Sequence, residues 1–312
     1  MRKAFFALMV AMGLLVAACA AKPAAGGGVT DPPVRSTTSD AAATSAAPQA
    51  AAVAVPTSSP PPTTTTTTSL PPPSTTLSPY ARPQWLGTRV LPLRADEHGE
   101  VQPTPPELEN RRLETLDLLP PPPNDEFAWT IAPVPAEVAQ RSTWREDCPV
   151  TLDELVYVTM SHWGFDDAFH TGEMIVNAAW ADEIVDVFRK LHEARYPIEQ
   201  MRVIRQDEVD ALPTGDWNDT TSFVCRPAVG SGNWSRHAYG LAVDINPFHN
   251  PYFKGDLVLP ELASFYEDRD PMYAGVITSG DVVVIAFAEI GWPWGGNWRT
   301  AKDYMHFSDN GH

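Results

Sequence analysis

The sequence predicts an α+β domain in the C-terminal half of the 312-residue chain, preceded by a long disordered linker. Residues 19–79 are mostly Ala, Pro, Thr, Ser and Gly, which supply too little apolar surface to offset the entropy of folding. Residues 176–194 repeat apolar side chains at helical spacing, whereas residues 241–246 alternate apolar and polar ones as a strand does. We therefore expect helices flanking a small antiparallel sheet.

The N-terminus has the pattern of a secretory signal. A charged start is followed by an apolar run, so residues 1–18 predict an exported protein. The run ends in Val16-Ala17-Ala18-Cys19, which resembles the lipobox of bacterial lipoproteins and predicts lipidation at Cys19. The alternative is an ordinary signal peptide with a cysteine at its cleavage site. With lipidation, the protein is expected outside the cytoplasm, anchored to the cell membrane by its lipid.

The charge balance excludes some partners. The chain carries 39 acidic and 22 basic residues, a formal net charge of -17. Because nucleic-acid binding needs clustered Lys and Arg, we expect no nucleic-acid partner. The sequence also lacks a polybasic membrane-binding patch, so membrane contact is expected through the N-terminal lipid only.

The other two cysteines form an even pair once Cys19 is assigned to lipid. In an oxidising compartment this predicts a disulfide between Cys148 and Cys225. The alternative is a pair of buried free thiols. The two are too far apart in sequence for a close-spaced zinc motif.

Residues 80–145 are rich in proline and predict an extended arm that is partly packed on the domain. We expect a short strand near residues 89–93 and a helical turn around residues 107–116. The aromatic side chains of Trp85, Phe127 and Trp129 indicate that the arm contacts the domain.

The domain itself is expected over residues 146–312. The Thr151 and Glu154 pair has the capping-box pattern and predicts a helix through about Ser161. Further elements are expected as a helix over 176–194, strands over 201–204 and 241–246, and a helix over 281–289 that ends at Gly291.

Two short segments carry the candidate metal ligands. In SRHAYGLAVDIN, a glycine turn separates His237 from Asp244, which the strand pattern places opposite the apolar face. In DYMHF, Asp303 precedes His306 by three residues, a spacing that suits one face of a helical turn. Two imidazoles and one carboxylate form a three-ligand zinc set of the catalytic kind, which leaves one position for water.

These motifs resemble the zinc D-alanyl-D-alanine carboxypeptidase and L-alanyl-D-glutamate endopeptidase family, the VanY-like peptidoglycan metallopeptidases. The family pattern of Ser-x-His, a glycine turn, an Asp, and an acid three residues before His-Phe is matched between residues 235 and 307. TSFVCRP and GWPWGGNW also resemble its endopeptidase-like branch. The resemblance implies the D,D-peptidase or hedgehog-like zinc peptidase fold, with one Zn²⁺ bound by His237, Asp244 and His306.

The chemistry of such a site gives roles to further residues. Asp303 is expected to be the general base for a metal-activated water. Arg226 is expected to stabilise the oxyanion or hold a substrate carboxylate, and Ser235 to bind substrate. Some family members, notably the dipeptidases, have Glu at the position of Asp303, so the shorter acid needs a closer approach to the water.

Other polar and aromatic residues receive no role from the sequence. We leave four histidines unassigned and interpret three tryptophans and one tyrosine as packing: His162, His170, His192 and His249, and Trp292, Trp294, Trp298 and Tyr304.

The sequence thus predicts a monomeric zinc carboxypeptidase or endopeptidase that cuts the stem peptides of peptidoglycan. The alternative is a non-catalytic zinc-binding or wall-binding surface lipoprotein that retains the fold. A solute-binding lipoprotein would need a larger two-lobed fold than the residues after the linker provide.

Overall fold

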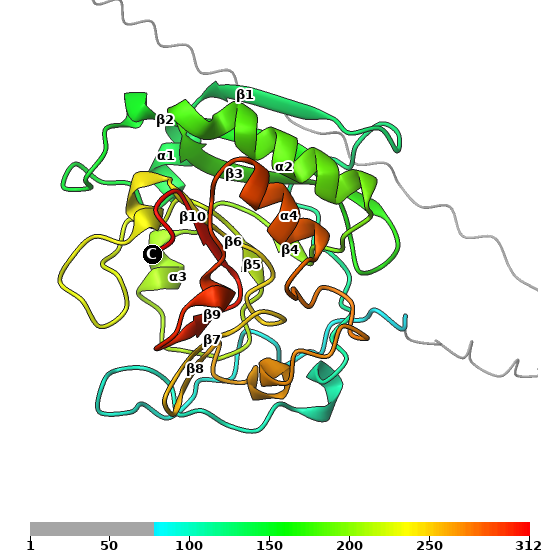
Figure 1. The fold of residues 1–312 in the computed structure, drawn as a ribbon, viewed down its shortest axis with the longest axis vertical. Helices are drawn as coiled ribbons and strands as arrows, with labels where there is room; N and C mark the ends of the chain where they lie inside the picture. Colours follow the sequence, from blue (N-terminus) through cyan, green and yellow to red (C-terminus); the bar gives the residue numbers. More distant parts are fainter. Residues whose placement is uncertain (1–77) are drawn as a thin grey trace, which may run out of the picture. The chain divides into compact units, whose positions relative to one another are not determined.

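The computed structural model describes residues 78–312 (Figure 1). The predicted signal peptide, the lipidation site at Cys19 and all but the last two residues of the predicted linker lie outside the described residues. Within residues 78–312, no helix combines the length and the apolarity needed to cross a membrane.

The largest sheet has three antiparallel strands in the order β1-β2-β3. Strands β2 (Leu155–Trp163) and β3 (Phe169–Asn177) pair along their full length, and β1 (Trp129–Pro133) pairs with the other edge of β2. Helix α2 (Ala181–Glu193) lies across this sheet in Figure 1. It is amphipathic, and its apolar face enters the main hydrophobic core.

The prediction of a helix from Thr151 to Ser161 is wrong. The capping box is present, but it closes only one 3-10 turn, Leu152–Glu154, before β2 begins. The β2 segment contains three valine or threonine residues and two aromatic ones, and it pairs with strands on both sides. Strand pairing therefore outweighs the local helix-start signal.

Helix α2 was predicted with nearly the right end but too early a start. Residues 176 and 177 complete β3, and a 3-10 turn at Ala178–Trp180 precedes the helix. Helix α4 (Val282–Glu289) agrees with its prediction; Asp281 caps it and Gly291 follows with a positive φ of 79°. Helices α2 and α4 pack against each other beside the sheet (Figure 1).

Residues 80–145 contribute to the core of the domain. Leu91, Leu108 and Leu113 are buried in a cluster with Phe248 and Tyr266. Trp85 packs against that cluster, and Phe127 packs against the main core.

The local structure expected for this segment is only partly present. The strand predicted at 89–93 is absent from the described residues, where one bridge joins Leu93 to Gly99. The turn predicted at 107–116 is a 3-10 turn at Pro106–Leu108. Trp129 begins β1 but stays 47% exposed, so it does not pack as expected. Helix α1 (Ala136–Arg141) follows β1.

The remaining strands are short and form three small sheets. The antiparallel strands are β6 (Ala242–Asp244) with β10 (His306–Ser308), and β8 (Leu257–Leu259), β7 (Tyr252–Lys254) and β9 (Lys302–Asp303) in that order. Strands β4 (Gln200–Met201) and β5 (Asp219–Thr220) are parallel, so the strand predicted over 201–204 is shorter than expected. Further short elements are α3 (Gln206–Val209) and 3-10 turns at Arg236–Tyr239, Ser264–Glu267 and Gly295–Asn297.

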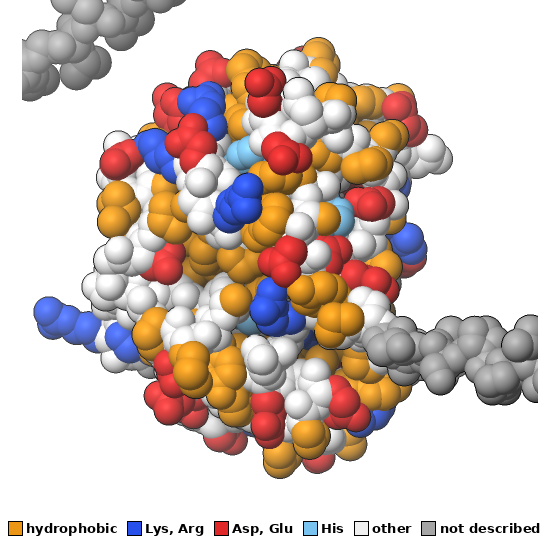
Figure 2. All heavy atoms as spheres, turned by 90° about the vertical axis from the view of Figure 1, so that its right-hand side faces the viewer, with side chains coloured by type: hydrophobic (Ala, Val, Ile, Leu, Met, Phe, Trp, Pro, Cys, Tyr) orange, Lys and Arg blue, Asp and Glu red, His pale blue; other side chains and the backbone are white. Residues whose placement is uncertain are grey.

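The α+β class is confirmed, with several small sheets in place of the single one expected. On the face shown in Figure 2, acidic and basic side chains are interspersed with hydrophobic ones.

Candidate metal centre

Local structure explains how His237 and Asp244 meet. Ser235 caps the 3-10 turn Arg236–Tyr239 by accepting a hydrogen bond from the His237 backbone N–H. Gly240 ends the turn in the left-handed region at φ 65°, and a side chain there would lie 2.6 Å from the Asn177 backbone nitrogen. The chain then reverses into β6, which carries Asp244.

His306 reaches the same point through strand pairing. Strand β10 is antiparallel to β6, and His306 is directly opposite Asp244 in the register. Directly opposed residues on paired strands place their side chains on the same face of the sheet. A residue 62 positions further along the chain is thereby brought beside Asp244.

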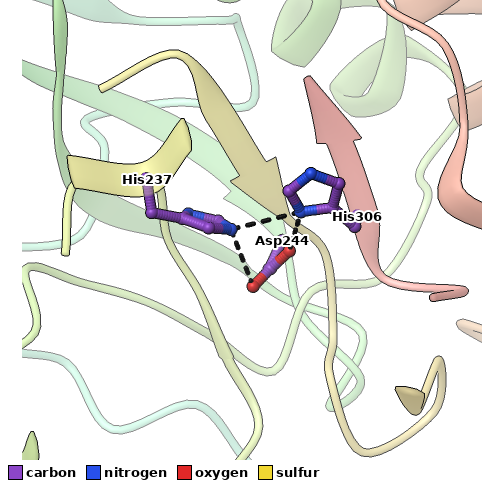
Figure 3. A group of neighbouring side chains, drawn as sticks. All are labelled: His237, Asp244 and His306. Atoms are coloured by element: carbon purple, nitrogen blue, oxygen red, sulfur yellow. Dashed lines mark hydrogen bonds and ion pairs between the residues drawn. The ribbon is translucent and has the colours of Figure 1, made fainter. Parts of the chain in front are cut away.

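The three side chains converge on one point (Figure 3). His237 Nε2 lies 3.2 Å from His306 Nδ1 and 3.2 Å from Asp244 Oδ2, and His306 Nδ1 lies 3.1 Å from Asp244 Oδ1. All three residues are buried.

Hydrogen bonds outside the triad orient the rings. The Nδ1 of His237 lies 2.6 Å from the carbonyl oxygen of Ser222, so this nitrogen donates and Nε2 presents its lone pair to the centre. Burial alone would raise the pKa of Asp244, but His237 and His306 outweigh that effect and lower it. Asp244 is therefore a carboxylate at neutral pH.

The donor set fits a tetrahedral zinc ion. Bonds of about 2.0–2.1 Å to nitrogen and oxygen place neighbouring ligand atoms about 3.3 Å apart. The three separations of 3.1–3.2 Å come close to that value. His306 Nδ1 is the better placed ligand atom of its ring, because it lies 3.1–3.2 Å from donor atoms of the other two residues.

Asp303 lies beside the triad but is not one of its three members. It ends β9, and only two residues separate it from the start of β10, so the prediction of a helical turn between Asp303 and His306 is wrong. The bend between the two strands turns both side chains toward the same pocket. The Oδ1 atom of Asp303 is buried and has no hydrogen-bond partner in the described structure. Burial raises the pKa of Asp303 to about 7, and His306 opposes the rise.

The triad opens into a pocket of about 500 Å³. Arg226 and Ser235, the residues expected to bind substrate, both line it. The Arg226 guanidinium bonds to the neighbouring Pro227 carbonyl at 3.2 Å, and no carboxylate pairs with it among residues 78–312. It thus offers an uncompensated positive charge to a ligand.

Four aromatic pocket residues were not predicted. Trp298, interpreted as packing, lines the pocket with its ring centroid 5.6 Å from that of His306. Trp217, Trp234 and Tyr252 also line it. Their only local signal was nearness to the TSFVCRP and LAVDIN motifs. Trp292 and Trp294 are buried in the main core, as expected for packing residues.

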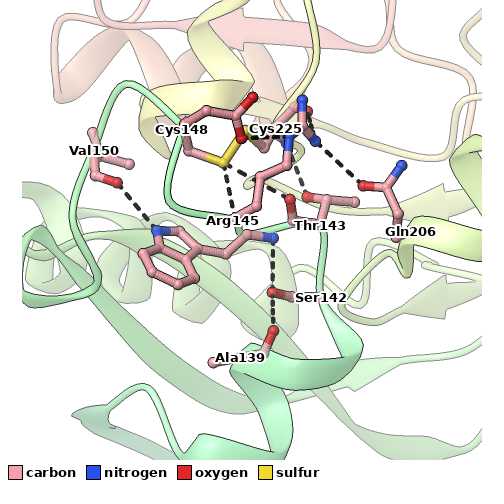
Figure 4. Close-up of a disulfide and its surroundings, with 10 residues drawn as sticks. Ala139, Ser142, Thr143, Arg145, Cys148, Val150, Gln206 and Cys225 are labelled. Carbon is pink, nitrogen blue, oxygen red and sulfur yellow. Dashed lines mark hydrogen bonds and ion pairs between the residues drawn. A yellow bond between two sulfur atoms is a disulfide. The ribbon is translucent and has the colours of Figure 1, made fainter.

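The disulfide between Cys148 and Cys225 is present, with an S–S distance of 2.04 Å (Figure 4). The Cys225 N–H donates to Thr143 Oγ1 at 2.9 Å, and the Arg145 guanidinium donates to the Cys225 carbonyl at 3.2 Å. Since Cys225 directly precedes Arg226, these contacts fix the start of one pocket wall to residues 143–148.

The four unassigned histidines remain outside the pocket lining. His170 lies between Asp117 and Asp166, at 2.8 and 3.0 Å from their carboxylate oxygens. His249 contacts Asn218 and the Arg111 carbonyl.

Comparison with known proteins gives one match. Residues 229–309 match a family model described as D-alanyl-D-alanine carboxypeptidase. No curated protein and no solved structure shows a significant match. The matched segment contains His237, Asp244, Asp303 and His306, whereas Arg226 lies just before it. This match confirms, over the segment that carries the site, the resemblance to the D-alanyl-D-alanine carboxypeptidase family that the motifs predict.

Proposed function

We propose that this protein is a zinc-dependent peptidase that hydrolyses the stem peptides of bacterial peptidoglycan. The observation that carries the proposal is the convergence of His237 Nε2, His306 Nδ1 and Asp244 in the lining of a pocket that Asp303 also lines. The family match supports a peptidase. His237, Asp244 and His306 would hold the ion.

A bound zinc ion would polarise the scissile carbonyl and lower the pKa of a water molecule toward neutrality. Asp303 is placed to accept the proton of that water and to pass it to the leaving amine. Its raised pKa of about 7 suits a group that both takes and returns a proton near neutral pH, although a cation in the triad would lower this value.

Pocket residues would orient the peptide. The Arg226 guanidinium is available for a substrate carboxylate or for the oxyanion. The Ser235 hydroxyl already accepts a hydrogen bond from the His237 N–H, so it is still able to donate one to substrate. Both a D,D-carboxypeptidase and an L-alanyl-D-glutamate-type endopeptidase fit these groups.

The proposed setting follows from the N-terminal sequence. Export through residues 1–18 and lipid attachment at Cys19 would hold a monomeric enzyme at the outer face of the membrane, within reach of the wall. The Pro-rich segment at 19–79 would span the distance between them.

Digestion of purified cell wall, analysed by mass spectrometry, tests the proposal. Wild type should release D-alanine if it is a carboxypeptidase, or cut within the stem if it is an endopeptidase, and His237→Ala should release neither. Asp303→Asn should be slower by about 10²–10⁴-fold while it retains the metal. The matched control is Asp256→Asn, an exposed acid outside the pocket. Equal products from wild type and His237→Ala would refute the proposal and favour the non-catalytic wall-binding protein.

A further inference from the structure

Trp217 is displayed at the pocket by a rigid segment of chain. Its side chain lines the pocket and is 41% exposed. The residues on either side, Asp216 and Asn218, are only 2% and 3% exposed. A large aromatic side chain thus faces solvent from between two buried polar anchors.

Hydrogen bonds hold Asp216 from three directions. Its carboxylate accepts from the Gly87 N–H at 2.8 Å and from the Thr214 hydroxyl at 2.6 Å. Its backbone carbonyl accepts from the Arg111 guanidinium at 2.7 Å. Residues 87 and 111 belong to the segment before the disulfide, so that segment helps to fix the backbone beside Trp217.

Asn218 is held equally firmly on the other side. Its Nδ2 donates to Glu199 at 2.7 Å, and its Oδ1 accepts from the Phe248 N–H at 2.8 Å. Reversing the backbone of residues 216–218 so that the indole points into the core would require these buried bonds to break, and each group left unpaired would destabilise the fold. The buried bonds of Asp216 and Asn218 therefore keep the Trp217 indole exposed.

The sheet beside the triad extends the pocket away from the reacting centre. Tyr252 on β7 is directly opposite Leu259 on β8 and directly opposite Asp303 on β9. The three side chains form a row on one face of the sheet, with neighbouring Cβ atoms about 4.5–5.5 Å apart. All three line the same pocket as Trp217. An apolar wall thus leads outward from the candidate general base.

We propose that Trp217 is a substrate-contacting residue that packs against the part of the stem peptide beyond the two residues flanking the cut bond. The proposal rests on the proposed function and deepens it: the site would prefer a stem peptide of three or more residues to a free dipeptide. A pocket of about 500 Å³ falls within the range that holds drug-sized ligands. A pre-positioned indole offers a large contact area with little entropy left to lose on binding.

Binding measurements on the full-length chain test this role. All variants carry Asp303→Asn, which keeps the ligand intact, and isothermal titration calorimetry compares a synthetic stem pentapeptide with D-alanyl-D-alanine. Trp217→Ala should weaken pentapeptide binding at least about tenfold, as truncation of a central interface tryptophan does, and should leave the dipeptide affinity unchanged. Trp217→Phe should recover part of the loss.

Trp129→Ala is the matched control, because Trp129 is 47% exposed and lies on β1, outside the pocket lining. It should bind both peptides as the parent does. Unchanged pentapeptide affinity in Trp217→Ala, equal weakening for both peptides, or no pentapeptide binding by any variant would each overturn the inference. Trp217-dependent binding together with a wild type that cuts no wall peptide would overturn the proposed function and leave this inference standing.

Discussion

Two buried polar clusters in this domain differ in how completely their atoms are paired. The first is the triad of His237, Asp244 and His306 together with Asp303. The second, here called the support network, consists of Arg111, Glu199, Asn218 and His249. Both bring together residues from distant parts of the chain.

In the support network the bonding is complete. Arg111 donates to both oxygens of Glu199, at 2.7 and 2.8 Å, and Asn218 donates to the same carboxylate. None of the four side chains has a buried polar atom without a partner among the described residues. In the other cluster, His306 Nε2 and Asp303 Oδ1 are buried without one.

This difference in hydrogen-bond pairing distinguishes a buried polar cluster that stabilises the fold from one that forms a candidate site. Buried polar groups normally find partners, because an unpaired one costs free energy. The support network satisfies that rule and joins residues before the disulfide to the rest of the domain. The triad cluster departs from it at Asp303 Oδ1, an acceptor atom of a side chain that lines the pocket, and a ligand there would complete its bonding.

Breaking the support network should have the largest effect on stability. Arg111→Ala leaves the Glu199 carboxylate buried beside a lost partner and should lower the free energy of unfolding by about 3–5 kcal/mol. Chemical denaturation monitored by circular dichroism measures this. Arg94→Ala removes a solvent-exposed pair with Asp256 and should change the free energy of unfolding far less than Arg111→Ala does. Similar losses in the two variants would contradict the assignment of Arg111 as a structural anchor.

Lowering the pH should remove the stabilisation by the support network over two pH ranges. Burial lowers the pKa of His249 to about 4, so stability is lost as pH falls from about 6.5 toward 4. Burial alone would raise the pKa of Glu199, but Arg111 outweighs it and holds the pKa at about 2, so further stability is lost from about pH 4.5 toward 2. Full protonation of each group should lower the free energy of unfolding by on the order of 3 kcal/mol.

Denaturation midpoints from pH 7 to 3 would show the decline. An NMR titration of histidine ring protons would follow His249 directly. A His249 signal that titrates near pH 6.5, or a stability that stays constant over this range, would contradict the complete pairing of the network.

Substitution of a triad residue should have the opposite effect to substitution in the support network. It should greatly weaken metal binding and lower the stability of the domain only a little. Because outer-shell changes cost about 10–100-fold in metal affinity, His306→Ala should cost at least about 100-fold. The metal-free variant should lose only about 1–2 kcal/mol of unfolding free energy, because Asp244 loses its contact with His306 but keeps its contact with His237 at 3.2 Å. Metal analysis after zinc repletion and denaturation of the metal-free protein measure the two effects. A variant that keeps its zinc would contradict the ligand assignment.

Predictions from the sequence succeeded where the signal was local. The Asp281 cap, the apolar run and Gly291 together define α4. Alternation around Asp244 correctly predicted a strand there, although β6 covers only Ala242–Asp244 of the predicted residues 241–246. They failed where pairing with a strand from a distant part of the sequence determines the local structure. The capping box at Thr151 is real, yet β1 and β3 make the following residues a strand.

The sequence by itself determined the fold class and the types of the candidate ligands, because periodicity, capping residues and each of the two short motifs, at residues 235–246 and 303–307, are patterns within a few consecutive residues. Only the tertiary structure decided that β10 pairs with β6 to bring His306 opposite Asp244. It also decided that Arg111 supports the loop displaying Trp217. Strand register and buried ion pairs join segments tens of residues apart, and their free energy depends on which partner is available in space.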